Sequence, residues 1–300
     1  MATVQPPIIG DSFAVGFRFQ HYWDDSMANA FYFGELGAGI FFISFLYNVT
    51  WGMVLGLAIT AILKTYFHLA HMGVPAKSWR AMMRPDRAWV SRGVILIQLF
   101  TVFGLLHLLN VYNGVFGLLP ADGALVTIIR VLAAISALGV VAYHGLAISD
   151  SPAISLWRNS MMPLVGFGYA MVSGAAVAAV LAGATATSSV WGALPDAGTL
   201  TLWLLVLEIV LIAIALFSVA NGLPGARVSA NLLLKGDLAK PFMSLVVVVG
   251  LAVPLLLLLL VPQSLWVSLL VAVAIMVGYR SFRVYLFRAG VYDPPISFAE

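Results

Sequence analysis

Eight long apolar stretches constrain this chain more than any other feature of its sequence. They lie at about 28–48, 51–71, 92–112, 124–147, 162–185, 199–221, 241–261 and 264–287. Each reaches the roughly 20 residues that a helix needs to cross a hydrocarbon core of about 30 Å, and none alternates as a barrel strand does. Turn-forming segments such as NGVFGLLPADG and WGALPDAG separate them. The sequence therefore predicts an all-α membrane protein with about eight transmembrane helices in one bundle.

The composition supports this class and limits the chemistry that the chain carries by itself. Only 9% of the residues are charged, whereas a soluble domain has about a quarter. The chain has no cysteine, which excludes disulfides, thiolate-bound zinc and thiolate-bound iron–sulfur clusters within it. We expect an N-terminal arm at 1–27 without the pattern of a cleaved signal, an eight-helix transmembrane domain at 28–288 and a C-terminal tail at 289–300.

The positive charges are predicted to lie on one face of the membrane. Thirteen of the fifteen Lys and Arg residues, Arg280 and Arg283 among them, fall in the termini and in the connections between spans 2–3, 4–5 and 6–7. We call this the charged face. Because positively charged segments are retained on the cytoplasmic side, both termini are expected to be cytoplasmic, in the inner membrane of a bacterium or archaeon. A basic face also suits the docking of an acidic partner. The candidate docking residues are Lys77, Arg80, Arg84, Arg87 and Arg92.

Five stretches occur in the order of a known family. HMGVPAKSWRAMMRP ends the second span and SRG opens the third, GELGAGIFF resembles a glycine-rich first helix, and AYHGLAIS resembles the tyrosine-containing end of a fourth. LLLKGDLAKPF and YRSFRVYLFRAGVY resemble the entry to a seventh helix and a C-terminal helix end. Together, over nearly the whole chain, they resemble the NrfD/PsrC (polysulfide reductase, DmsC-like) family of membrane anchor subunits.

The resemblance implies a membrane subunit of a respiratory oxidoreductase complex that is not catalytic alone. It implies binding of a quinone or quinol (menaquinone or ubiquinone), no haem, and electron exchange with a partner that holds four iron–sulfur clusters, commonly beside a molybdopterin catalytic subunit. Membrane lipid is expected around the chain, and no nucleic acid. Two positions depart from the family. MGVPAKSWR replaces a common Gly-Arg-Pro, which passes the arginine's role to Arg80 or Arg84, and Tyr143-His144-Gly145 replaces Tyr-Thr-Gly.

Quinone chemistry favours candidates at the charged face. Oxidation of a quinol releases two protons with two electrons, and histidine suits their acceptance because it titrates near neutral pH. Tyr143 and His144 are the first choice, since the resemblance puts a quinone-binding tyrosine at position 143. Any of the candidates could instead be an interfacial side chain that anchors a helix end. The residues that topology places at this level are His21, Asn29, Tyr32, His68, His71, Arg80, Asp86, Tyr143 and His144, and of these all but His68 and Asp86 are proposed quinone contacts.

Ionisable residues within the spans are costly and therefore candidates for function. At about 1.5 Å per residue, Glu35 and Lys64 lie about 12 and 10 Å inside the charged face. Arg130 and Glu208 lie about 9 and 13 Å from the opposite face, with His107 near that level. The sequence thus predicts one cluster in each leaflet, which serves either as structural ion pairs such as Glu35–Lys64 or, together with Asp86, as a proton relay.

Two other functions stay open at this point. A haem b anchor would draw axial ligands from different helices, with His68 or His71 opposite His144. A secondary transporter would use the buried Glu35, Lys64, Arg130 and Glu208, although the two halves of the chain show no matching Gly/Pro interruptions. An optical spectrum separates the haem anchor from the quinone subunit.

Overall fold

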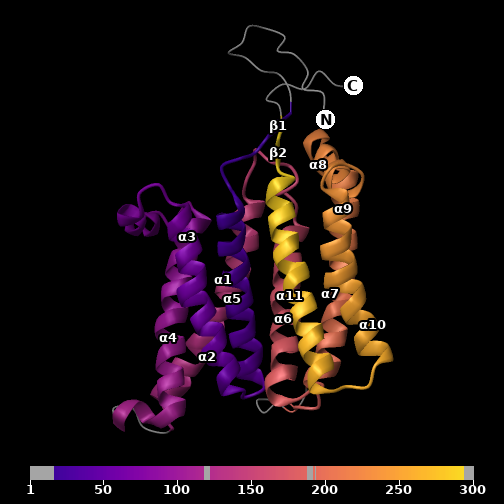
Figure 1. The fold of residues 1–300 in the computed structure, drawn as a ribbon. Helices are drawn as coiled ribbons and strands as arrows, with labels where there is room; N and C mark the ends of the chain where they lie inside the picture. The colour runs from indigo at the N-terminus through magenta and orange to yellow at the C-terminus, as the bar shows by residue number, and fades with distance from the viewer. Residues whose placement is uncertain (1–16, 118–121, 188–191, 193, 294–300) are drawn as a thin grey trace.

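The computed structural model describes residues 17–117, 122–187, 192 and 194–293. In this part, eight helices are long and apolar enough to cross a membrane, and they pack side by side as one bundle (Figure 1). The prediction of an all-α bundle is confirmed. The spans are α1 (Asp25–Leu46), α2–η1–α3 (Thr50–Ala58, Ile59–Lys64, Thr65–His71), α4 (Trp89–Gly117), α5 (Ala124–Ser149), α6 (Met161–Ala182), α7 (Ala197–Ala220), α9–η3–α10 (Ala239–Phe242, Met243–Ala252, Val253–Leu260) and α11 (Leu265–Arg288).

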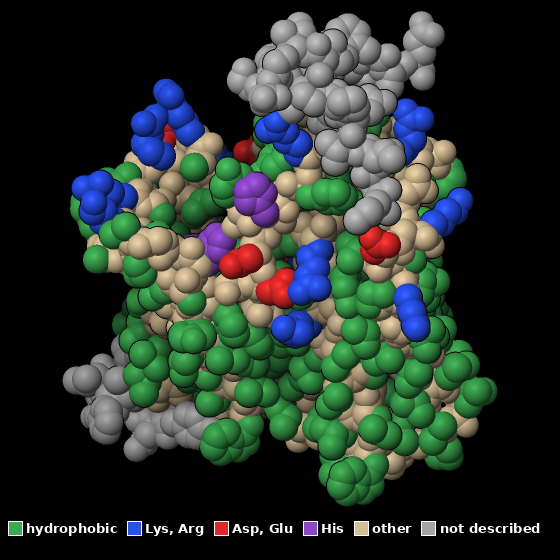
Figure 2. Space-filling model, turned by 45° about the horizontal axis from the view of Figure 1, so that its top comes forward, with side chains coloured by type: hydrophobic (Ala, Val, Ile, Leu, Met, Phe, Trp, Pro, Cys, Tyr) green, Lys and Arg blue, Asp and Glu red, His purple; other side chains and the backbone are tan. Residues whose placement is uncertain are grey.

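The two ends of the described chain meet at one end of the bundle. Strand β1 (Arg18–Phe19) pairs antiparallel with β2 (Val291–Tyr292), and Gln20 donates to the carbonyl of Phe287 at 2.7 Å. The short helices η2 (Pro75–Met82) and α8 (Pro224–Leu234) lie at the same end (Figure 1). Lys and Arg side chains gather around it, whereas hydrophobic side chains cover the flank of the bundle (Figure 2). The pairing joins the predicted arm to the predicted tail, whose boundaries stay predictions.

Helices α1 and α6 form the centre of the bundle, because small residues let their backbones approach closely. A Cβ on Gly39 of α1 would overlap the carbonyl of Ala170 on α6, and one on Gly174 of α6 would lie 2.5 Å from the carbonyl oxygen of Gly39. Small residues at such crossings are typical of membrane helices, where packing replaces the hydrophobic effect. Both helices are therefore largely shielded from lipid by their neighbours.

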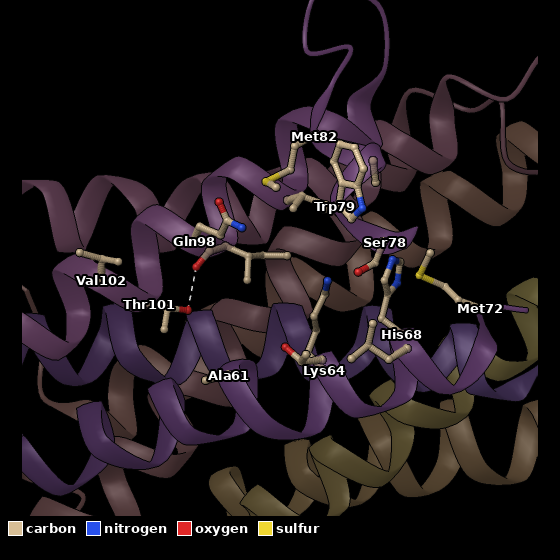
Figure 3. Close-up of a pocket in the computed structure, with 15 residues that line it drawn as sticks. Ala61, Lys64, His68, Met72, Ser78, Trp79, Met82, Gln98, Thr101 and Val102 are labelled. Atoms are coloured by element: carbon tan, nitrogen blue, oxygen red, sulfur yellow. Dashed lines mark hydrogen bonds between the residues drawn. The ribbon is translucent and has the colours of Figure 1, made fainter. Parts of the chain in front are cut away.

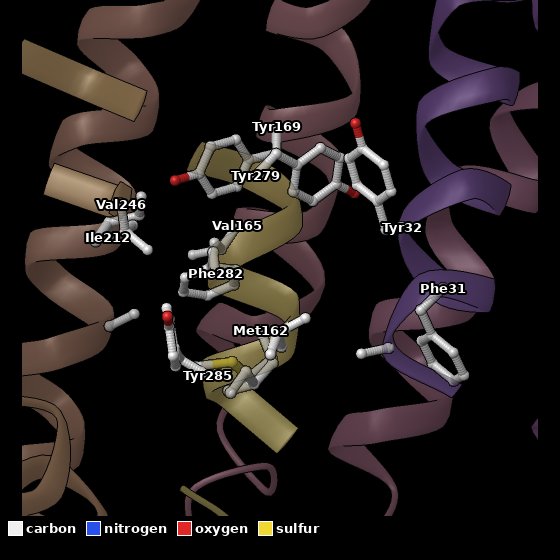
Figure 4. Close-up of a cluster of buried hydrophobic side chains, with 14 of the residues drawn as sticks. Phe31, Tyr32, Met162, Val165, Tyr169, Ile212, Val246, Tyr279, Phe282 and Tyr285 are labelled. Carbon is white, nitrogen blue, oxygen red and sulfur yellow. The ribbon is translucent and has the colours of Figure 1, made fainter. Parts of the chain in front are cut away.

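An aromatic cluster fixes α11 against this centre. The rings of Tyr169 on α6 and Tyr279 on α11 stack with centroids 4.6 Å apart, and Tyr32 on α1 meets Tyr279 edge-on at 5.2 Å (Figure 4). The ring of Phe282, also on α11, lies tilted against that of Tyr169 with centroids 5.5 Å apart. These contacts bring α1, α6 and α11 together at the depth where the buried charges lie.

Two spans contain wider, π-helical turns. The first, η1, places Thr60 against α1, where a Cβ on Gly37 would overlap the Thr60 hydroxyl, and ends at Lys64. The second, η3, crosses α11 where Gly250 meets Gly278. A π turn contains more residues than an α turn, so it rotates the side chains that follow relative to a regular helix, and such turns are frequent at functional sites.

Helix α7 begins with a side-chain cap. Asp196 accepts hydrogen bonds from the N–H and the hydroxyl of Thr199, at 2.9 and 2.8 Å. Partial burial tends to raise the pKa of Asp196, but these hydrogen bonds outweigh it and hold the pKa below its ordinary value. The cap therefore works with an ionised carboxylate.

Candidate functional site

A cavity of about 600 Å³ lies between the α2–η1–α3 span and α4, with η2 along one side (Figure 3). Its walls are mainly apolar, but Gln98 and Val102 of α4 are exposed at its edge, on the side of the span that faces lipid. A lipid-soluble molecule could enter the cavity from the membrane. The lining residues include Lys64, Thr65, His68, Leu69, Met72, Ser78, Trp79, Met82, Ile97, Gln98, Thr101 and Val102.

Two nitrogen-bearing side chains on one face of the span point into this cavity. Lys64 is 4% exposed, and no hydrogen bond or ion pair forms to it from any residue that the structure describes. His68, one helical turn later, has a buried Nδ1 without a hydrogen-bond partner. Buried polar groups are nearly always satisfied in proteins, so His68 Nδ1 is available to hydrogen-bond a molecule in the cavity, and the unpaired ammonium of Lys64 is available beside it.

His144 lies directly behind Lys64. It is 0% exposed, and its Nδ1 is 2.8 Å from the carbonyl of Val140, so Nδ1 carries the proton and Nε2 is the acceptor. Nε2 has no partner. A Cβ on Gly34 would lie 2.6 Å from this nitrogen and 3.1 Å from Cγ of Lys64, which shows that the two side chains meet over Gly34. Tyr143 is also buried, and its ring lies tilted against that of His144, with centroids 3.9 Å apart. Neither Tyr143 nor His144 lines the cavity.

Two further predicted quinone contacts lie elsewhere, on α1. Asn29 accepts a hydrogen bond from Nε of Arg280 at 2.9 Å. Tyr32 is 5% exposed and packs in the aromatic cluster against Tyr279. Asn29 is thus hydrogen-bonded to α11, and the ring of Tyr32 packs against α11.

The remaining predicted contacts lie at the surface. His71 bonds Asp24 at 3.0 Å, and His21 stacks on Tyr22 at 4.5 Å. Slight burial tends to raise the pKa of Asp24, but hydrogen bonds from Met27 and His71 outweigh it and keep the pKa below its ordinary value. The structure therefore brings together Lys64, Tyr143 and His144 from the sequence-based candidates. The predicted contacts that lie apart from the cavity are His21, His71, Asn29, Tyr32 and the exposed Arg80.

The predicted Glu35–Lys64 pair is wrong. Glu35 pairs with Arg283, whose guanidinium nitrogen lies 2.5 Å from a carboxylate oxygen, and it also accepts a hydrogen bond from the Tyr279 hydroxyl. Both partners of the pair are 0% exposed. Arg283 therefore does not belong to the charged face, where the sequence placed it. The physical reason is that the guanidinium turns inward from α11 to neutralise a carboxylate that water cannot reach.

The predicted cluster of Glu208 with Arg130 is also wrong. Glu208 is 0% exposed, and neither of its carboxylate oxygens has a hydrogen-bond partner. It packs against Gly168 and interacts electrostatically with Arg283 and Glu35. Arg130, in contrast, is exposed on α5. The two buried carboxylates, Glu35 and Glu208, therefore share one polar cluster with Arg283 across α1, α6, α7 and α11, and Arg130 lies apart from it.

The basic connection after α3 has an ordered charge pattern. Asp86 lies at the surface, 3.5 Å from Arg84 and 3.2 Å from Arg87. Arg92 donates to the carbonyl of Pro85 at 2.8 Å and lies over the ring of Trp89, 4.5 Å from its centroid. Arg92 thus helps to hold the loop, and Asp86 lies apart from the buried ionisable groups. The side chains that remain exposed for a partner are Lys77, Arg80, Arg84 and Arg87.

Several residues of the cavity and of the buried Glu35–Arg283 cluster were not predicted from the sequence. Gln98 and Thr101 line the cavity, but no motif distinguishes them. Trp79 also lines it and lies within the stretch HMGVPAKSWRAMMRP, although no role at the site was predicted for it. Tyr279 and Arg283 had a usable signal, because they lie four residues apart and therefore on one helical face. Among the residues that the structure describes, no three His, Asp or Glu side chains come together as a metal site.

Comparison with known proteins agrees with this architecture. The family model described as "Polysulphide reductase, NrfD" matches residues 16–294. The chain belongs to the NrfD family. NrfD proteins are membrane subunits of respiratory oxidoreductase complexes, are generally quinone-reactive and typically pair with iron–sulfur and molybdopterin subunits. A search of curated proteins finds no match to the chain.

Proposed function

We propose that this NrfD protein binds a quinone or quinol in the cavity between α3 and α4 and exchanges electrons with an iron–sulfur partner subunit. The observation that carries the proposal is the buried Nδ1 of His68, which has no partner, next to the unpaired side chain of Lys64 at a mainly apolar cavity that reaches the lipid side. A quinone head needs hydrogen-bonding groups at its oxygens, whereas its isoprenoid tail needs an apolar path to the membrane. The cavity offers both.

The proton chemistry follows from the three nitrogens. Oxidation of a quinol removes two electrons, which go to the partner's cluster, and two protons, which need acceptors. His68 is placed to accept a hydroxyl proton from the bound head group, and Lys64 to donate to the opposite oxygen. The free Nε2 of His144, next to the stem of Lys64, is a second acceptor behind the cavity. In the reverse direction the same groups supply protons to a quinone.

The position of η2 links the cavity to the partner. Ser78 and Trp79 of η2 line the cavity, while Lys77 and Arg80, on the same short helix, are exposed. An iron–sulfur subunit that docks on this basic loop would bring its nearest cluster close to the quinone head. We therefore assign docking to Lys77, Arg80, Arg84 and Arg87, and we propose that the charged face is cytoplasmic and that the complex contains a molybdopterin subunit but no haem in this chain.

The test is photolabelling of the purified native complex with an azido-quinone, followed by peptide mapping. Label is expected in residues 61–82 and 94–102, and excess unlabelled quinone should remove it. Lys64→Met and His68→Phe should each lower quinone-linked turnover by about a hundredfold, since loss of a positioned proton-transfer group typically costs that much. Tyr66→Phe is the matched control, because Tyr66 is on the same helix but 63% exposed and outside the cavity. Label confined to other helices, or full turnover in both variants, would refute the assignment.

A further inference from the structure

Arg130 is a cation in an unusual place. It lies six residues after the start of α5, about 9 Å from that helix end, in the half of the bundle away from the charged face. Its side chain is exposed between the lipid-facing Ile128 and Ile135, which are 54% and 59% exposed. It makes no hydrogen bond or ion pair with any residue in the part of the chain that the structure describes. A guanidinium without a counter-ion at this depth is costly unless an anion meets it.

Two polar side chains of α4 lie at the same level. His107 is 4% exposed, its ring meets that of Phe45 at a steep angle with centroids 5.5 Å apart, and it interacts electrostatically with Arg130. Asn110, one turn further along the same face of α4, has a buried side-chain oxygen without a partner. Helices α4 and α5 pack against each other, and Leu96 of α4 fills the space beside Gly139 of α5. The seam between these helices is thus apolar in its middle and polar at this end.

We infer that Arg130, His107 and Asn110 form a binding site for the headgroup of an anionic phospholipid in the leaflet opposite the charged face. Arg130 pairs with the lipid phosphate, and it reaches the headgroup level by extending its apolar stem along the helix. His107 and Asn110 supply further hydrogen bonds to headgroup oxygens at the α4–α5 seam. The acyl chains lie on the exposed isoleucines of α5.

Charge supports this occupant. Of the fifteen Lys and Arg residues, Arg130 is the one that lies in this leaflet, and the connections at this face hold no Lys or Arg. No second cation therefore competes for the lipid phosphate. A net-negative headgroup satisfies the guanidinium, whereas a zwitterionic lipid brings its own cation to the site.

The experiment uses the full chain with its native partners, reconstituted in nanodiscs that contain equal parts of phosphatidylglycerol and phosphatidylcholine. Native mass spectrometry counts the lipids that remain bound on release from the disc. Wild type should retain phosphatidylglycerol in preference to phosphatidylcholine, and Arg130→Gln should bind it about tenfold more weakly, because one charge-assisted contact is lost. Arg130→Lys should retain part of the preference. Inorganic phosphate should not displace the lipid.

The control removes one positive charge elsewhere. Lys235→Gln alters an exposed lysine at the charged face and should leave the retained lipid unchanged. If Lys235→Gln and Arg130→Gln lost the same amount of bound phosphatidylglycerol, the loss would follow from net charge alone, and the proposed site would be overturned. Unchanged lipid retention in Arg130→Gln would also overturn the site. If Arg130→Gln instead lost a copurifying membrane subunit and kept the lipid, Arg130 would contact a protein, and the site would again be overturned.

Discussion

Replacing Arg283 by Met tests the buried ion pair in the centre of the bundle. The substitution leaves Glu35 0% exposed, with the Tyr279 hydroxyl as its remaining partner in the described part of the chain. Removing one member of a buried pair costs about 3–5 kcal/mol, because the other charge stays buried without compensation. The double variant Glu35→Gln with Arg283→Met removes both charges, and it should recover most of that free energy of unfolding.

The matched control lies one turn earlier on the same helix. Arg280 is exposed and donates a single hydrogen bond to Asn29, so Arg280→Met should cost no more than about 1 kcal/mol. Reversible unfolding in mixed micelles, followed by tryptophan fluorescence, gives the four free energies of unfolding. An Arg283→Met variant within about 1 kcal/mol of wild type would contradict a buried ion pair of this strength, as would a double variant no more stable than the single one.

Three further outcomes follow from the structure. Gly39→Ala should lower the thermal midpoint of unfolding, since the added Cβ overlaps a carbonyl of α6, whereas Gly73→Ala, with nothing within 4 Å, should not. Asp196→Ala should cost about 1 kcal/mol by removing the cap of α7. Because the folded-state pKa of this carboxyl is depressed, the difference from wild type should be full above its unfolded pKa and fade as pH falls below it, and a constant difference down to acidic pH would contradict the cap. Arg80→Glu with Arg84→Glu should reduce the partner subunit that copurifies, and undiminished recovery would leave these arginines without a docking role.

The architecture could be predicted because a membrane imposes its own length on every span. A helix in lipid must satisfy its backbone internally and cover about 30 Å, so hydropathy alone located all eight helices within a few residues. The α1–α6 centre could not be predicted in the same way. Its glycines at 39 and 174 are readable as small residues, but the sequence does not say which helix each one faces.

The site was predicted in part, and the errors have a common cause. Counting residues gives depth, and the depths of Glu35 and Glu208 agree with their burial in the middle of the bundle. Pairing needs the direction of each side chain around its helix, which depends on packing. Arg283 lies about 7.5 Å inside the end of α11, deep enough to reach Glu35. A count of Lys and Arg residues by segment nevertheless assigns Arg283 to the C-terminal segment, and so to the charged face. His144 was predicted as a quinone contact, and the structure buries it behind Lys64 rather than in the wall of the cavity, so its role stays a prediction.

Because of the π turn at Ile59–Lys64, the direction of the side chains that line the cavity depends on the number of residues in this turn. Each residue in a regular helix turns the chain by about 100°, so deleting one residue within this turn would let it tighten and swing everything beyond it, His68 included, toward lipid or toward α1. The same deletion in the exposed loop before α4 would leave that histidine where it is. A homologue without this wider turn should therefore be aligned with a gap at this point. A histidine that aligns with His68 after such a gap need not occupy the same position in space.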